Sequence, residues 1–195
     1  MDLDPEGVRS VLDGVGTSVG VENAIGDVVL PAMHEVGTRW KAGICDAANE
    51  HLLTESVRRW LARQTTFAPP AFQPGPVVLS CGPKELHSVG LEAFGALLVG
   101  RGWRVIMLGA MTPVDSLRKA VLESQAHAAV VVAQRAVNRR STSESLTAIE
   151  PLLGDRAFYA GGAFITPSSR RDVSGTYLGT DILVAAATID ATGRA

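Results

Sequence analysis

PVVLSCGPKELHSVG, residues 76–90, is the stretch that decides the fold of the second half of the chain. Its first part, residues 76–82, is a largely apolar run, and it leads into a short loop that carries His87. An amphipathic segment begins near Gly90. A buried strand that passes through a loop into a helix is the repeating unit of a parallel sheet covered by helices. We therefore expect an α/β architecture with an imidazole presented between a strand and a helix.

The loop itself carries candidate chemistry. Glu85 stands two positions before His87, so its carboxylate can accept a hydrogen bond from one ring N–H of the imidazole. That contact would fix the tautomer and make the other ring nitrogen a better metal ligand. Gly90 lets a large group approach the backbone closely. The alternative interpretation of His87 is an ordinary solvated histidine on a surface loop.

The alternation of apolar runs and amphipathic segments continues beyond this loop. Strands are predicted at 77–80, 103–108, 128–133, 157–160 and 176–178, and helices near 88–101, 113–124, 141–153, 167–172 and 181–189. This pattern predicts a Rossmann- or flavodoxin-like, doubly wound parallel sheet, in which ligands bind at the carboxyl ends of the strands beside the switch point. His87 is expected at that edge. Thr112 follows the second strand at the same edge, where a helix N-terminus can donate to amide or phosphate groups of a cofactor.

Residues 1–66 have the pattern of helices instead. Apolar residues recur at helical spacing around 8–15, 25–40 and 47–61. Gly14, Gly16 and Gly20 are expected to break helices, and Asp46 is a good N-cap for the last one. We expect three or four short helices in a four-helix-bundle-like cap. Residues 67–76 contain four prolines and a glycine and are predicted to link this cap to an α/β domain at 77–195.

Composition narrows the class of protein. The 195 residues are 46% hydrophobic with a formal net charge of −2, as expected for a soluble globular chain. A pI of about 6.1 argues against a dedicated nucleic-acid-binding surface. The basic pairs at 58–59, 139–140 and 170–171 are interpreted as solvated faces or loops. Cys45 and Cys81 are expected to be reduced thiols of a cytoplasmic protein, and no apolar run is long enough to span a bilayer.

The remaining conspicuous residues have structural interpretations. Trp60 and Trp103 fit apolar faces and are predicted to lie in the core. His127 begins an apolar strand without an acidic neighbour and is interpreted as structural, while His34 is expected to face solvent. No Ser-His-Asp arrangement, zinc-type cluster or phosphate loop appears, so we do not expect an enzyme.

A second group of residues has a specific spacing. Trp40 is followed after nine residues by Glu50 and His51, and Gly43 and Asp46 between them indicate that Trp40 closes one helix and the pair opens the next. A short turn would bring all three to one end of the bundle. Alone, Trp40 fits a core position and the pair fits a surface. Together with Glu-x-His-x-x-Gly, this spacing resembles the sensory region of CarH-type, LitR-like cobalamin photoreceptors, which sense light through adenosylcobalamin.

The resemblance implies a role for each matching residue. His87, oriented by Glu85, would be the lower axial ligand of the cobalt of adenosylcobalamin. Trp40 would cover the upper adenosyl group. Glu50 and His51 would hold that group and contribute to subunit contacts.

Other positions bear on the nucleotide tail of cobalamin and on the light state. Gly161 and Gly162 match a glycine pair that leaves room for the tail. The Ser-x-Leu element expected after the third strand is absent, and Gln134 is a possible substitute donor. Lys41 stands where some members have a histidine that captures cobalt after photolysis, which puts a bis-histidine light state in doubt.

The resemblance implies an adenosylcobalamin-binding light sensor of a transcriptional regulator, with light cleaving the Co–C bond and a dark homo-oligomer changing its assembly. These regulators usually begin with a MerR-type helix-turn-helix domain, which this sequence does not contain. DNA contact would therefore come from a domain outside this sequence or from a partner protein. The alternatives are a corrinoid methyl carrier of a methyltransferase system and a cobalamin-binding antirepressor that acts through a partner.

Overall fold

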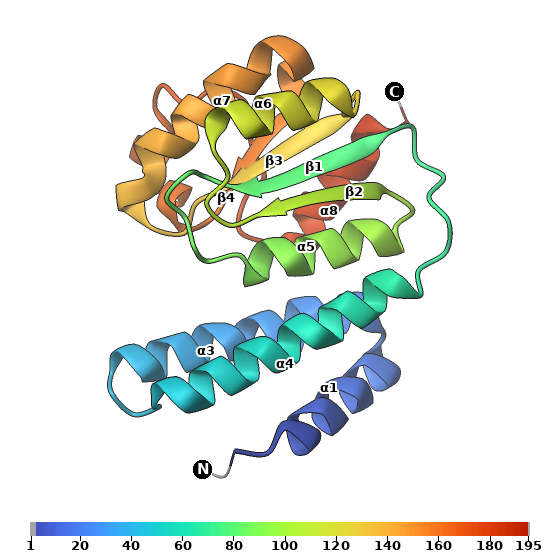
Figure 1. Ribbon diagram of the computed structural model, residues 1–195, viewed down its shortest axis with the longest axis vertical. Helices are drawn as coiled ribbons and strands as arrows, with labels where there is room; N and C mark the ends of the chain where they lie inside the picture. The colour runs from blue at the N-terminus through green and yellow to red at the C-terminus, as the bar shows by residue number, and fades with distance from the viewer. Residues whose placement is uncertain (1–2, 195) are drawn as a thin grey trace. The chain divides into compact units, whose positions relative to one another are not determined.

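Two units, Met1–Ala68 and Pro69–Ala195, make up the chain in the computed structural model, which describes residues 3–194 (Figure 1). The last helix of the first unit ends at Thr66, and the first strand of the second begins at Pro76. Within residues 3–194, no helix combines the length and the apolarity that a membrane span requires.

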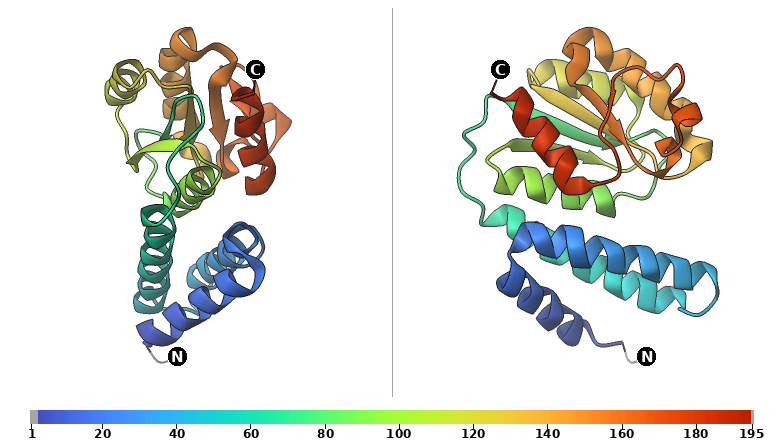
Figure 2. Two further views of the ribbon diagram at one scale, coloured as in Figure 1. Left: turned by 90° about the vertical axis from the view of Figure 1, so that its right-hand side faces the viewer. Right: turned by 180° about the vertical axis from the view of Figure 1, so that it is seen from behind.

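The first unit consists of helices. They are α1 (Pro5–Val19), α2 (Val21–Asn23), the π-helical turn η1 (Ala24–Val29), α3 (Leu30–Lys41) and α4 (Ala47–Thr66). Residues 21–41 are helical without a break, so α2, η1 and α3 form one long helix that packs beside α4 (Figure 2). The described part of this unit therefore has three helical rods, one fewer than a four-helix bundle. Asp46 caps α4 as predicted, because its carboxylate accepts a hydrogen bond from the backbone N–H of Asn49 at 2.8 Å.

The predicted helix breaks at Gly14 and Gly16 are wrong. Helix α1 runs through both, and the chain breaks only at Gly20, whose φ of 81° suits glycine. A Cβ atom at Gly16 would lie 3.0 Å from Cζ2 of Trp60, which is buried in α4 as predicted. Gly16 therefore serves close packing of α1 on α4 rather than a turn.

The second unit is a five-stranded parallel sheet. Its strands are β1 (Pro76–Cys81), β2 (Arg104–Gly109), β3 (Ala128–Val132), β4 (Ala157–Ala160) and β5 (Thr176–Tyr177), in the order β2-β1-β3-β4-β5. All six residues of β1 are buried, which explains its continuous apolar sequence. The order reverses between β1 and β3, so the loop after β1 lies at the switch point. The predicted flavodoxin-like topology is confirmed.

Helices cover both faces of this sheet (Figures 1 and 2). Helices α5 (Val89–Gly100) and α8 (Ile182–Thr192) pack on one face, and α6 (Val114–Glu123) and α7 (Arg139–Leu153) pack on the other. Short 3₁₀ turns complete the unit: η2 (Ala136–Asn138), η3 (Gly154–Arg156), η4 (Gly162–Phe164) and η5 (Pro167–Arg170).

The helix predicted at 167–172 is wrong. Only the turn η5 forms there, because Asp172 adopts a left-handed φ of 58°, which ends the helical path, and the segment is too short to nucleate a helix. Helix α7 also begins at Arg139, two residues before its predicted start at Ser141.

Side-chain hydrogen bonds join elements at the amino-terminal ends of the strands, opposite the switch-point loops. Trp103 is buried as predicted, and its indole N–H donates to Asp190 at 2.7 Å. His127 is structural as predicted: its Nε2 lies 3.0 Å from Oγ1 of Thr192, and Arg156 lies 3.2 Å from its Nδ1. An arginine only donates, so Nδ1 accepts and the imidazole is neutral. These contacts join the end of α8 to the starts of β3 and β4.

Candidate functional site

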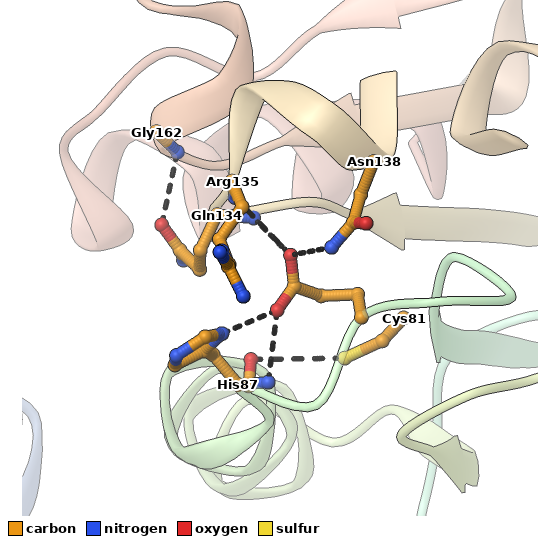
Figure 3. Close-up of polar contacts among 7 residues, drawn as sticks. Cys81, His87, Gln134, Arg135, Asn138 and Gly162 are labelled. Carbon is orange, nitrogen blue, oxygen red and sulfur yellow. Dashed lines mark hydrogen bonds and ion pairs between the residues drawn. The ribbon is translucent and has the colours of Figure 1, made fainter. Parts of the chain in front are cut away.

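The loop after β1 presents His87 on a buried carboxylate. Glu85 has no exposed surface, and its Oε1 accepts hydrogen bonds from the backbone N–H of His87 at 3.0 Å and from Nδ1 of the ring at 2.5 Å (Figure 3). A carboxylate only accepts, so Nδ1 carries the proton and Nε2 keeps its lone pair. The side chain of His87 is 60% exposed. The arrangement therefore offers one oriented imidazole nitrogen to a metal.

The second oxygen of Glu85 binds the loop after β3. Oε2 accepts from the backbone N–H groups of Gln134 at 2.8 Å and Arg135 at 3.2 Å, and from Nδ2 of Asn138 at 2.9 Å (Figure 3). Burial by itself raises the pKa of Glu85, but the hydrogen bonds from Asn138, from His87 and from Arg135 outweigh it and lower the pKa to about 2. Glu85 is therefore an anion that ties two loops of the sheet edge together.

The backbone of the His87 loop is held separately. The amide N–H of Met111, after β2, donates to the carbonyl of Glu85 at 2.9 Å. The thiol of Cys81 donates to the carbonyl of His87, with 3.8 Å between sulfur and oxygen. Burial, together with the carboxylates of Glu85 and Glu92, raises the pKa of Cys81 to about 12, so this thiol stays protonated. Cys45 and Cys81 are both free, as expected.

The glycine pair after β4 packs against the loop after β3. Gly161 has a φ of 107°, and a Cβ atom there would lie 2.3 Å from the carbonyl oxygen of Ala133. The N–H of Gly162 donates to Oε1 of Gln134 at 2.9 Å (Figure 3). A Cβ atom at Gly90, in α5, would lie 4.0 Å from Nε2 of the same Gln134. The Gln134 amide thus lies between Gly90 and Gly162, with its nitrogen available as a donor.

Thr112 is engaged within its own loop. The side chain is buried, and its hydroxyl donates to the carbonyl of Gly109 at 3.1 Å. The hydroxyl therefore stabilises the turn after β2.

In the helical unit, Trp40, Glu50 and His51 lie on the two sides of the turn that joins α3 to α4. Trp40 lies at the end of α3, and Glu50 and His51 lie in the first turns of α4, as predicted. Trp40 is 50% exposed, so its interpretation as a core residue is wrong. Glu50 accepts from Thr54 at 2.8 Å and lies 3.5 Å from the largely exposed His51 ring. The half-exposed indole thus leaves an apolar face open near the turn that also leads to Glu50 and His51.

Some residues at the carboxyl edge were missed by sequence reasoning. Asn138 was not considered, although asparagine is common before a helix; here its amide donates to Glu85 instead of capping α7. Four exposed apolar side chains follow four successive strands, and their positions after the strands are the signal that was available: Leu86, Met111, Val137 and Ile165. Apolar residues repeated at one sheet edge suit a broad apolar ligand.

Comparisons with known proteins agree with this chemistry. A family model described as a B12 binding domain matches residues 1–63. Two curated relatives are HTH-type transcriptional repressors of Myxococcus xanthus: CarH, 35% identical over 119 residues, and CarA, 32% identical over 151 residues. The matches cover 61% and 77% of this chain. The chain is a cobalamin-binding region related to CarH and CarA. It spans 40% and 50% of the lengths of these two relatives.

Solved structures share the fold at low sequence identity. A cobalamin-binding protein from Desulfitobacterium hafniense is 18% identical with a TM-score of 0.54, over 98% of this chain and 93% of that one. The methanol:cobalamin methyltransferase complex MtaBC of Methanosarcina barkeri is 18% identical with a TM-score of 0.55, over 97% and 74%. The monomethylamine corrinoid protein of the same organism is 11% identical with a TM-score of 0.66, over 95% and 96%. These likenesses confirm the predicted B12-binding fold with its helical cap.

Proposed function

We propose that this cobalamin-binding region is an adenosylcobalamin-dependent light sensor of a transcriptional regulator. The observation that carries the proposal is the exposed His87 imidazole, whose Nδ1 is held by the buried anion of Glu85. Nε2 is then a neutral nitrogen donor of fixed orientation, which suits the lower axial position of cobalt. The donor therefore fits the cofactor that the family implies.

The sheet unit supplies the remaining contacts to the lower half of the cofactor. With His87 as the cobalt ligand, the cofactor's own benzimidazole would be displaced, and its nucleotide tail would need a separate place. We assign it to the region of Gly90, Gly161 and Gly162, where Nε2 of Gln134 is available to donate. The Thr112 hydroxyl already donates to the carbonyl of Gly109, so its contribution is to hold the loop after β2.

The helical unit supplies the contacts to the upper ligand. Trp40 covers the adenosyl group, and Glu50 and His51 hold it through polar contacts. Adenosylcobalamin contributes a cobalt–carbon bond that light cleaves. Trp40, Glu50 and His51 would lose their contacts once the adenosyl group is gone, and the helical unit would shift to another state by no more than the ligand's differential affinity for the two states.

The regulatory output would require contact with DNA. CarH and CarA are HTH-type repressors, and the chain spans half of their length or less. DNA contact would come from a helix-turn-helix domain or a partner protein, and the chain would act in the cytoplasm, where adenosylcobalamin and DNA are both present.

The visible spectrum tests this function. The protein is loaded with adenosylcobalamin in the dark, and the spectrum is recorded before and after green light. A sensor shows a lasting change to a spectrum without the adenosyl ligand, and the released adenosyl product is recovered after gel filtration. A protein that keeps the dark spectrum after illumination does not sense light through this bond.

A corrinoid methyl carrier is the second candidate, because MtaBC and the monomethylamine corrinoid protein share the fold. A carrier needs an open upper face to pass a methyl group, and Trp40 would obstruct it. Incubation with a methyl donor and a methyltransferase distinguishes the two functions. A carrier turns over repeatedly, whereas a sensor does not.

A further inference from the structure

A groove on the sheet unit lies outside the proposed cobalamin contacts of His87 and Gln134. Its volume is about 690 Å³, and it is formed by the 3₁₀ turn η2, the first turns of α7 and the segment after η5. The lining residues are Ala136, Val137, Arg139, Arg140, Ser143, Glu144, Thr147, Arg171 and Val173.

The groove carries an excess of positive charge. Three arginines line it, and the one acidic residue in the lining, Glu144, is paired with Arg140 at 3.1 Å. Within the part of the chain that the structure describes, neither Arg139 nor Arg171 has an ion pair. Two guanidinium groups from separate segments therefore face one concave surface without a counter-charge.

The protein itself does not offset this charge. Nε of Arg139 is buried without a hydrogen-bond partner among residues 3–194, and a buried donor without a partner destabilises the fold. Arg139 and Arg140 also occupy the first turn of α7, where the helix dipole disfavours cations, and that turn has no acidic residue. An anion bound in the groove would relieve both effects.

We propose that this groove binds a phosphorylated small molecule of nucleotide size. Guanidinium groups match phosphate oxygens with paired, charge-assisted hydrogen bonds, and the hydroxyls of Ser143 and Thr147 lie in the same lining. Ala136, Val137 and Val173 give the groove an apolar wall that suits a flat base. The volume lies within the usual range for small-molecule sites. Charge and apolar wall together select a phosphate attached to an apolar group.

Isothermal titration of the whole chain tests the site, with ADP, pyrophosphate and adenosine as probes. We expect ADP to bind saturably, pyrophosphate to bind more weakly, and adenosine to bind least. The double variant Arg139→Gln with Arg171→Gln should weaken ADP binding at least about tenfold, since it removes both unpaired guanidinium groups and their charge-assisted bonds to phosphate. Arg118→Gln, an exposed arginine in α6 outside the groove, is the matched control and should bind as the unaltered chain does.

The titration is repeated on protein saturated with hydroxocobalamin, because Val137 also belongs to the apolar edge near His87. Retained ADP binding there supports a separate site. The proposal is overturned if ADP fails to saturate, if the double variant binds ADP as well as the control, or if cobalamin abolishes binding. ADP that binds no tighter than pyrophosphate would overturn the nucleotide-sized ligand and leave a simple phosphate site.

Discussion

His87 carries its ring proton on Nδ1 because Glu85, its partner there, only accepts hydrogen bonds. The two-residue spacing made this pair predictable, since both residues belong to one loop. The three donors to the other oxygen of Glu85 come from about fifty residues further along the chain and were not predictable. They depend on the pairing of β1 with β3, which brings the two loops together. The sequence therefore predicted the contact between Glu85 and His87, but not the hydrogen bonds that the loop after β3 donates to Glu85.

Replacing the imidazole that we propose as the cobalt ligand is the first test at this scale. His87→Ala should weaken cobalamin binding and give a bound spectrum without protein imidazole, because no other donor replaces Nε2 on that loop. Absorbance titration with adenosylcobalamin in the dark measures both. His34→Ala, which removes an exposed histidine of α3, should change neither. Equal affinity and an unchanged spectrum in His87→Ala would refute the assignment.

The hydrogen bonds that support Glu85 can be tested through a variant of Asn138. Asn138→Ala removes one hydrogen bond to a buried anion and should lower the free energy of unfolding by about 2 kcal/mol. It should also reduce imidazole ligation in the cobalamin spectrum, because Glu85 then holds His87 less firmly. Urea unfolding and the visible spectrum are the measurements. Ser141→Ala, which removes the hydroxyl that donates to the Asn138 carbonyl, should leave the spectrum unchanged, and a matching loss in both variants would contradict the role of Asn138.

At the scale of elements, the strands and main helices of the sheet unit followed from alternating apolar runs. The errors arose where tertiary packing overrides local preference. Gly16 sits inside a helix because Trp60 packs on it, and Asp172 takes a left-handed conformation that no pattern reveals. Trp40 fits an apolar stripe, yet it is half-exposed at the turn between α3 and α4.

The exposed indole gives a prediction for the helical unit. Trp40→Ala should leave corrin binding largely intact, because the contacts that we propose for the lower half of the cofactor come from the sheet unit. It should lower the preference for adenosylcobalamin over hydroxocobalamin, which competition titrations in the dark measure. Trp60→Ala, a core change, should instead destabilise the fold by about 3–5 kcal/mol. An unaltered preference in Trp40→Ala would mean that this indole does not touch the upper ligand.

The neutral His127 makes the anchoring of α8 sensitive to acid. Burial, followed by the charge of Arg156, lowers the pKa of His127 below its usual 6.5. The unfolded chain then binds the proton more readily, so this contribution to stability is full above pH 6.5 and is lost as the pH falls through the lowered pKa. His127→Gln keeps a donor for Thr192 and an acceptor for Arg156 but does not titrate. Urea unfolding between pH 5 and pH 8 should show a weaker pH dependence in this variant; parallel curves would contradict the account.

At the scale of the whole molecule, the chain combines a helical unit matched by a B12 binding domain model with a sheet unit that presents one oriented imidazole. We propose that the two act on one cofactor, His87 on the lower ligand position and Trp40, Glu50 and His51 on the upper one. Light would then change the contacts of Trp40, Glu50 and His51 and leave the contact of His87 in place. A few kcal/mol of differential binding would suffice to alter a modest interface between copies.

Size-exclusion chromatography with light scattering tests this claim most directly, on the adenosylcobalamin-loaded chain in the dark and after green light. The chain has a mass of 20.5 kDa, and we predict a dark dimer or tetramer that becomes smaller after illumination. Protein loaded with hydroxocobalamin is the control and should give the smaller mass in both conditions. Identical masses for the adenosylcobalamin-loaded sample in the dark and in the light would contradict a light-controlled assembly.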